Sequence, residues 1–140
     1  ARPSAANLQA FVTKFSPDGK TVLFTTYFGG SRQDGASSLA LDAAGNIYVA
    51  GQTESPDFPT LSAFQSAYGG GDRETGGDAF VLKLNPAGDT LLYSTFLGGA
   101  RGEMARGLAV DASGAAYLCG MTSSTNFPVR NAIQATSRGG

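Results

Sequence analysis

The side chains that could do acid–base or metal chemistry in this chain are carboxylates, because the sequence contains no histidine. Without histidine, the chain alone cannot form a Ser-His-Asp or Cys-His nucleophile, or a zinc site of cysteine and histidine. Asp34 and Glu103 stand at matching places, each shortly after a Gly-Gly pair. Two facing carboxylates could serve as the acid and base of a glycosidase. The simpler interpretation places both residues in solvated loops.

A second acidic stretch, GGGDRETGGD at 69–78, could hold a cation. Asp72, Glu74 and Asp78 offer carboxylate oxygens on a glycine-rich backbone, and Ca²⁺ prefers oxygen ligands. The spacing fits neither an EF-hand loop nor the nonapeptide calcium repeat. Calcium binding and a plain glycine-rich loop therefore both remain as interpretations, and we expect no other cofactor.

Composition argues against several classes of partner. Ten basic and eleven acidic residues give a net charge of −1, so the chain has no basic surface for nucleic acid. No apolar run approaches the roughly 18 residues of a membrane span. The 20 glycines and the absence of long apolar stretches favour an all-β protein rich in turns.

The chain is an internal repeat with a period of 69 residues. Shifting the sequence by 69 aligns residues 11–71 with 80–140 without a gap, and 27 of these 61 positions are identical. We therefore divide it into a first repeat at about 2–70 and a second at about 71–140. Residues 69 apart in the two repeats are called equivalent below.

Each repeat contains two predicted β-hairpins. In the first repeat, Ala10–Phe15 should pair with Thr21–Phe28 around a Pro-Asp-Gly turn, because Pro fixes φ and Gly accepts φ > 0. Ser38–Leu41 should pair with Ile47–Gly51 around Asp42–Asn46, where the aspartate can accept from backbone N–H groups of the turn. Four antiparallel strands per repeat are typical of a β-propeller blade.

The segment after the second hairpin is long, and it carries a Phe-Pro pair in both repeats. We expect Phe58 and Phe127 to pin this segment onto the sheet, and Leu61–Tyr68 could form one helical turn. Cys119 is the single cysteine, so it cannot form a disulfide within the chain. Its equivalent is Ala50, and we expect Cys119 to be a small buried apolar residue.

Hairpin topology places the variable loops at one end of each blade and the tight turns at the other. A binding surface, if the blades have one, should lie at the loop end, since loops carry most binding residues. The alternative is that these polar residues only keep the surface soluble. The candidate ligand-binding residues are Arg32, Gln33, Asp34, Asp57, Arg101, Glu103 and Asn126.

The repeat pattern AFV-x-K-[FL]-x-P-x-G-x-T…[YF]-[FL]-G-G, followed by LA-[LV]-D-x-x-G-x-x-Y-[VL]-x-G-x-T-x-S-x-x-FP, resembles the bacterial SBBP repeat, a family named for seven-bladed β-propellers. In the first repeat the resemblance rests on Phe11, Lys14, Pro17, Gly19, Gly29, Gly30, Leu39, Asp42, Gly45, Tyr48, Gly51, Thr53, Phe58 and Pro59, and each recurs 69 residues later. The resemblance implies a propeller in large secreted or envelope-associated bacterial proteins. It supplies no catalytic motif.

Two repeats cannot close a ring that needs at least four blades. We expect half a blade, a whole blade and half a blade, forming one propeller segment over 1–140 with an incomplete ring. The exposed apolar blade faces predict partners: further blades of a longer protein, or identical chains. The function expected is therefore a non-catalytic structural or protein-interaction module of an extracellular or envelope protein. The alternative is a propeller that binds or cleaves carbohydrate with carboxylates at the loop end.

Overall fold

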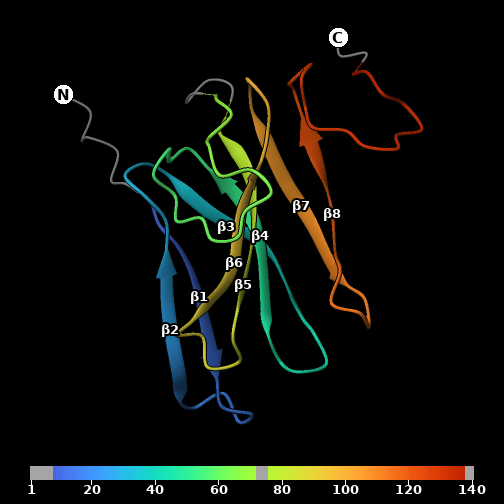
Figure 1. The fold of residues 1–140 in the computed structure, drawn as a ribbon. Coiled ribbons are helices and arrows are strands. Elements are labelled where there is room, and N and C mark those ends of the chain that lie inside the picture. Colours follow the sequence, from blue (N-terminus) through green and yellow to red (C-terminus); the bar gives the residue numbers. More distant parts are fainter. Residues whose placement is uncertain (1–7, 72–75, 138–140) are drawn as a thin grey trace, which may run out of the picture.

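The computed structural model describes residues 8–71 and 76–137, and these residues form an all-β structure (Figure 1). Within them lie eight strands, each paired antiparallel to its neighbours. In chain order they are β1 (Ala10–Phe15), β2 (Val22–Phe28), β3 (Asp34–Leu41), β4 (Ile47–Thr53), β5 (Asp78–Leu84), β6 (Leu91–Leu97), β7 (Glu103–Val110) and β8 (Ala116–Thr122).

The strands form three sheets with the orders β1-β2, β3-β4-β5-β6 and β7-β8. The central sheet is one complete propeller blade, and a two-stranded half-blade lies on each side of it (Figure 1). This arrangement confirms the predicted fold class and the sequence of half, whole and half blade. The ring is not closed within the described part of the chain.

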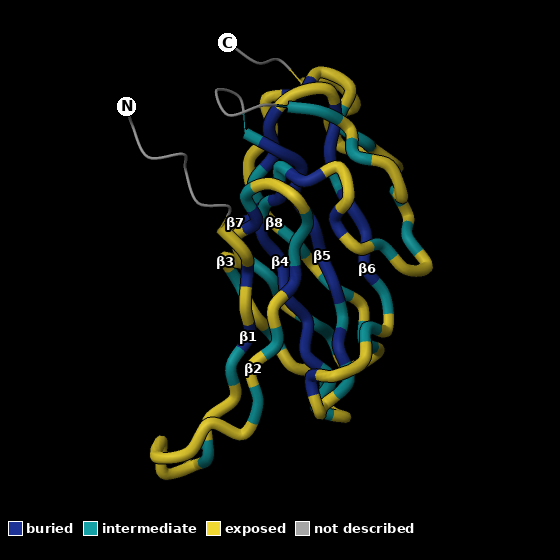
Figure 2. The backbone as a smooth tube through the Cα atoms, turned by 90° about the vertical axis from the view of Figure 1, so that its left-hand side faces the viewer, coloured by how far each residue is buried: buried dark blue, intermediate teal, exposed yellow. Residues whose placement is uncertain are grey.

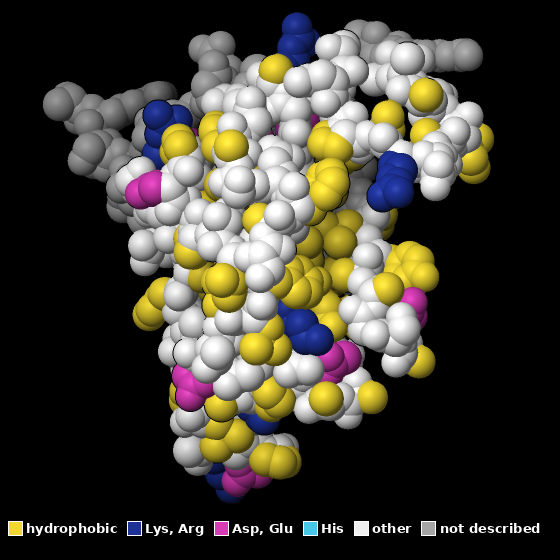
Figure 3. Space-filling model, viewed as in Figure 1, with side chains coloured by type: hydrophobic (Ala, Val, Ile, Leu, Met, Phe, Trp, Pro, Cys, Tyr) yellow, Lys and Arg dark blue, Asp and Glu magenta, His cyan; other side chains and the backbone are white. Residues whose placement is uncertain are grey.

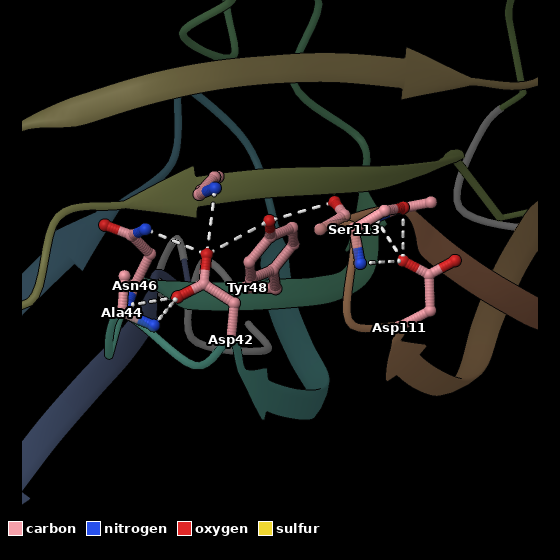
Figure 4. Close-up of polar contacts among 9 residues, drawn as sticks. Asp42, Ala44, Asn46, Tyr48, Asp111 and Ser113 are labelled. Carbon is pink, nitrogen blue, oxygen red and sulfur yellow. Dashed lines mark hydrogen bonds and ion pairs between the residues drawn. The ribbon is translucent and has the colours of Figure 1, made fainter.

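Turn chemistry explains why the hairpins form where the sequence places them. Asp42 Oδ1 accepts from the backbone N–H groups of Ala44 and Asn46 at 3.0 and 2.9 Å, and Asp111 holds its own turn in the same way (Figure 4). Gly45 takes the left-handed conformation with φ 81°, which glycine adopts at little cost. The predicted capping role of both aspartates is confirmed.

The larger apolar core lies between the hairpin β1–β2 and the central blade, where β4, β5, β6 and Phe58 contribute to it. Phe80 and Phe96 of the central blade are fully buried, and Val12 and Phe28 of β1–β2 pack into the same cluster. The rings of Phe28 and Phe80 meet edge to face with centroids 6.0 Å apart. Figure 2 shows the result, with burial concentrated on β4 and β5 and exposure at the far tip of β1–β2.

The other face of the central blade packs on β7–β8 through a second, smaller cluster of Ala50 of β4, Ala79 of β5 and Ala105 of β7. Small side chains let the two backbones approach closely, and the Ser37 hydroxyl donates to the Ala105 carbonyl at 2.6 Å. The central blade is therefore covered on both faces, each time by the equivalent hairpin of a neighbouring blade.

Two local predictions are wrong. β3 begins at Asp34 rather than Ser38, because a bulge between Ala36 and Ser38 lets the pairing with β4 continue to Thr53. Leu61–Tyr68 forms no helical turn. Leu61 instead exchanges backbone hydrogen bonds with Ser94 of β6 at 3.0 and 2.9 Å. Across 8–71 and 76–137 there is no helix long and apolar enough to cross a membrane.

Candidate functional site

The loop after each Gly-Gly pair is anchored at three successive backbone amides. The N–H groups of residues 30–32 donate, each at 2.8 Å, to Asp34 Oδ2, Asp57 Oδ1 and Ser55 Oγ respectively. These three side chains come from the start of β3 and from the long loop after β4. Gly30 is required here, since a Cβ at this position would collide with Asp57 Oδ1 and the Ser55 Cβ.

The second repeat builds the same anchorage with different residues. The N–H groups of residues 99–101 donate to Glu103 Oε2, Asn126 Oδ1 and Ser124 Oγ at 3.0, 2.9 and 2.8 Å. Glutamate replaces aspartate at one point and asparagine replaces aspartate at another. The loop thus needs an oxygen acceptor at each point, and side-chain length and charge vary between repeats.

Asp34 and Glu103 do not lie in solvated loops, as one of our two interpretations held. They are only 3% and 2% exposed, because they open strands β3 and β7 beneath the anchored loops. Asp34 also accepts from the hydroxyls of Thr53 and Ser55, and Glu103 accepts from the Thr122 hydroxyl at 2.7 Å. Each carboxylate is occupied by donors of its own repeat.

The remaining candidate ligand-binding residues belong to the loops after β2, β4, β6 and β8, and these loops lie at the end of the blades opposite the tight turns (Figure 1). Arg32 and Arg101 are exposed, while Gln33 is half-buried. Asp57 and Asn126 are also exposed, although one oxygen of each is already held by the loop amides. The hydrogen bond from the Ser31 N–H lowers the pKa of the Asp57 carboxyl. Ligand binding by these side chains stays a prediction.

The comparison with family models matches the segment that contains this anchorage. Residues 23–59 match the SBBP model, described as a beta-propeller repeat. The chain contains an SBBP repeat. The matched segment runs from β2 through the anchored loop and β3–β4 to Phe58 and Pro59, and residues 92–128 are its equivalent in the second repeat. No curated protein matches the chain.

A beta-propeller repeat suggests a structural or interaction module. It also explains the Phe-Pro pair. Phe58 is 3% exposed and stacks on Phe80 at 4.6 Å between centroids, which confirms its predicted pinning role. Phe127, its equivalent in the second repeat, is only half-buried.

Asp78 is the one member of the proposed calcium set that the structure describes, since Asp72 and Glu74 lie outside the described residues. It is fully buried, and its Oδ2 accepts from the Gly69 N–H at 2.7 Å and from Gln65 Nε2 at 3.1 Å. Among the residues that the structure describes, its Oδ1 has no hydrogen-bond partner. Burial, with a contribution from the negative charge of Glu103, raises the pKa of Asp78 to about 6.

Calcium binding stays a prediction. In the described ranges, no group of three or more His, Cys, Asp or Glu side chains is arranged to hold a metal ion.

A polar cluster at the turn end of the SBBP blades was not singled out from the sequence. Lys83 Nζ lies 3.0 Å from Asp42 Oδ2 and 4.7 Å from the centroid of the Tyr48 ring. The Tyr48 hydroxyl donates to the Gly114 carbonyl of the next blade at 3.0 Å (Figure 4). The hydrogen bond from Asn46 is the largest cause of the lowered pKa of Asp42. The sequence did contain a signal for this cluster, because its Asp, Tyr and Lys recur in both repeats.

Equivalent residues of the two repeats differ sharply in burial. Phe80 is 0% exposed and its equivalent Phe11 is 60% exposed. Cys119 is exposed, so the prediction that it is buried is wrong, although its equivalent Ala50 is fully buried. The reason is that β5 and β7 cover Ala50, whereas no described strand covers Cys119 in the same way. Hydrophobic side chains are visible in the hollow beside β7–β8 and at the tip of β1–β2 (Figure 3).

Proposed function

We propose that the chain is a non-catalytic propeller segment that binds further blades through the uncovered faces of its two half-blades. The observation that carries this proposal is the difference in burial between equivalent residues. Where a neighbouring hairpin is present, the side chain is interior; where it is absent, the same kind of side chain is exposed. The exposed large apolar residues of the half-blades are Phe11, Phe15, Val22, Leu23, Tyr27, Tyr117 and Met121.

Such an accumulation of exposed aliphatic and aromatic side chains is unusual for a soluble monomer and typical of an interaction surface. The equivalence of the two repeats indicates which kind of partner would cover these exposed residues. The hairpins that cover these positions in the central blade are SBBP hairpins, so the hairpins that complete the half-blades should be of the same type.

The non-catalytic part of the proposal is supported by the occupation of the carboxylates. Asp34 and Glu103 accept from loop amides and hydroxyls, which leaves each of them tied to its own loop. We expect no hydrolysis of oligosaccharides by the wild type and no difference from the Asp34→Asn and Glu103→Gln variants. Turnover that either variant abolishes would favour a carbohydrate-cleaving propeller instead.

We further propose that the parent protein is secreted or exposed at a bacterial cell surface. The support is the resemblance of both repeats to the SBBP family. Fractionation of a producing cell, followed by immunodetection of the chain, tests the location. Recovery in the cytoplasm alone would contradict it.

A tandem duplicate tests the main proposal without depending on association between molecules. Two copies joined end to end bring one β8 and one β1 together on the same polypeptide. We expect a higher melting temperature than for the single copy, and less than twice its binding of a dye for apolar surface. An unchanged melting temperature with doubled dye binding would overturn the proposal.

A further inference from the structure

We propose that a second copy of this chain completes the half-blade β7–β8. Strand β1 of the second copy pairs with β8 of the first, and Phe11 of the second copy fills a cavity beside Phe127 of the first. This inference rests on the proposed function and names the partner, the register and the anchoring side chain.

The register follows from the pairing inside the central blade. There β4 pairs antiparallel with β5, from Ile47↔Leu84 to Thr53↔Asp78. Adding 69 to the β4 numbers and subtracting 69 from the β5 numbers gives β8 against β1. Ala116 then lies opposite Phe15, and Cys119 lies opposite Val12. Among the described strands β8 pairs with β7 and β1 pairs with β2, so each presents its other edge.

The cavity has the size and lining of a phenylalanine site. Its volume is about 200 Å³, and its walls include Leu97, Leu118 and Phe127. An apolar cavity of about 150 Å³ suffices for benzene. These wall residues are the equivalents of Phe28, Val49 and Phe58, which belong to the cluster that buries Phe80 in the central blade.

Phe11 is the equivalent of Phe80, and it is 60% exposed on the edge strand β1. In the derived register it faces Gly120, as Phe80 faces Gly51 within the chain. Gly120 also lines the cavity. The register therefore brings together Phe11 on β1 and the cavity that is lined by residues of β8.

The polar contacts agree with the same register. Lys83 pairs with Asp42 and lies over the ring of Tyr48; the equivalents are Lys14 on β1 and Asp111 and Tyr117 at β8. Lys14 and Tyr117 are both exposed. The second copy would thus bring Lys14 to Asp111 and the ring of Tyr117, which matches opposite charges and places a cation over an aromatic face.

Within one copy, the edge of β1 cannot pair with the edge of β8. β1 and β8 lie on opposite sides of the central blade, in Figure 1 at the left and right of the molecule. The interface is therefore heterologous, joining the β8 edge of one copy to the β1 edge of the next.

A disulfide between copies tests the register. Directly opposed residues of antiparallel strands have Cα atoms about 4.5–5.5 Å apart, within the range of a disulfide. Under oxidised glutathione, Val12→Cys should link to the native Cys119 of another copy and give covalent species at multiples of 14.3 kDa on a non-reducing gel. Thr13→Cys, one position off on the other face of β1, and Val12→Cys combined with Cys119→Ser should give none.

The association itself is measured by light scattering across a concentration series. Phe11→Ser should weaken it about 100-fold, as loss of a central aromatic anchor does. The matched control is Phe64→Ser, because Phe64 is 74% exposed but lies on the loop between β4 and β5, not on β1 or β8. It should leave association unchanged. A wild type that stays monomeric, with no linkage through Val12→Cys, would overturn the inference. If the tandem duplicate were nevertheless stabilised, the proposed function would stand without it.

Discussion

The central blade and the half-blades are built from equivalent positions of the two repeats in opposite environments. Tyr48 is fully buried and its hydroxyl reaches the next blade, while its equivalent Tyr117 is 62% exposed and stays within its own turn. The strands, turns and loop anchorages are the same in both. The local fold of each repeat is therefore set by its own sequence, whereas burial is supplied by its neighbours.

The strongest test of this comparison is the same truncation at two equivalent positions. Phe80→Ala should lower the free energy of unfolding by about 3–5 kcal/mol, because it removes a fully buried ring from the core. Phe11→Ala should change it by about 0.5 kcal/mol or less, since the ring is largely in solvent. Urea unfolding at low protein concentration measures both, and equal costs would contradict the comparison.

The loop anchorage provides the next largest effect. Asp34→Ala should cost about 2–4 kcal/mol, because it leaves a backbone N–H and two hydroxyls near Asp34 without their acceptor. Asp57→Ala is the matched control, and it should cost clearly less, since Asp57 is exposed and water can replace it. Chemical unfolding monitored by circular dichroism distinguishes them; a larger loss for Asp57→Ala would reverse the assignment.

Asp78 has no carboxylate equivalent in the first repeat, where Gln9 stands. At this position the two repeats therefore differ in charge. Its pKa of about 6 lies above the ordinary 3.8, so the folded state binds more protons than the unfolded state between these values. Its contribution therefore increases stability as the pH falls from about 6 to about 4.

Asp78→Asn should stabilise the protein at pH 7 by about 1–3 kcal/mol and remove this part of the pH dependence. Melting temperatures of both proteins from pH 4 to pH 8 measure it. Parallel curves for wild type and variant would contradict the assignment of the titration to Asp78.

The smallest expected difference concerns one hydroxyl. Tyr48→Phe should cost about 0.5–1.5 kcal/mol, because the hydrogen bond to the Gly114 carbonyl links two blades. Tyr117→Phe should cost less in the isolated chain, where its hydroxyl makes an exposed contact with Asp111 at 3.2 Å. Thermal unfolding of the pair checks this, and a greater cost for Tyr117→Phe would argue that the half-blade is already covered.

The hairpins were predictable because their turns are specified locally by glycine and aspartate. The burial of Asp34 and Glu103 was not, since the hydroxyl partners Thr53 and Thr122 lie 19 residues further along the chain and polarity alone suggests solvent. The prediction that Cys119 is buried was wrong for a different reason. Its burial was inferred from Ala50, and that inference assumed a covering strand that the described chain does not place there.

The Phe-Pro segment shows the same division. Phe58 was recognised because its pairing with proline recurs in both repeats. The segment after it was misread, because Leu61 and Gln65 bond to the backbone of β6, some 30 residues away in sequence. Local propensity carries no information on such a partner.

The 2-4-2 distribution of strands has an arithmetic consequence for any ring of identical copies. Each copy contributes two blades' worth of strands, so the total number of blades is even. Every junction between copies also falls in the middle of a blade, where backbone hydrogen bonds run across it, and not between two blades. Opening the ring would therefore mean splitting a sheet, and a ring of seven blades would require an odd blade from another polypeptide.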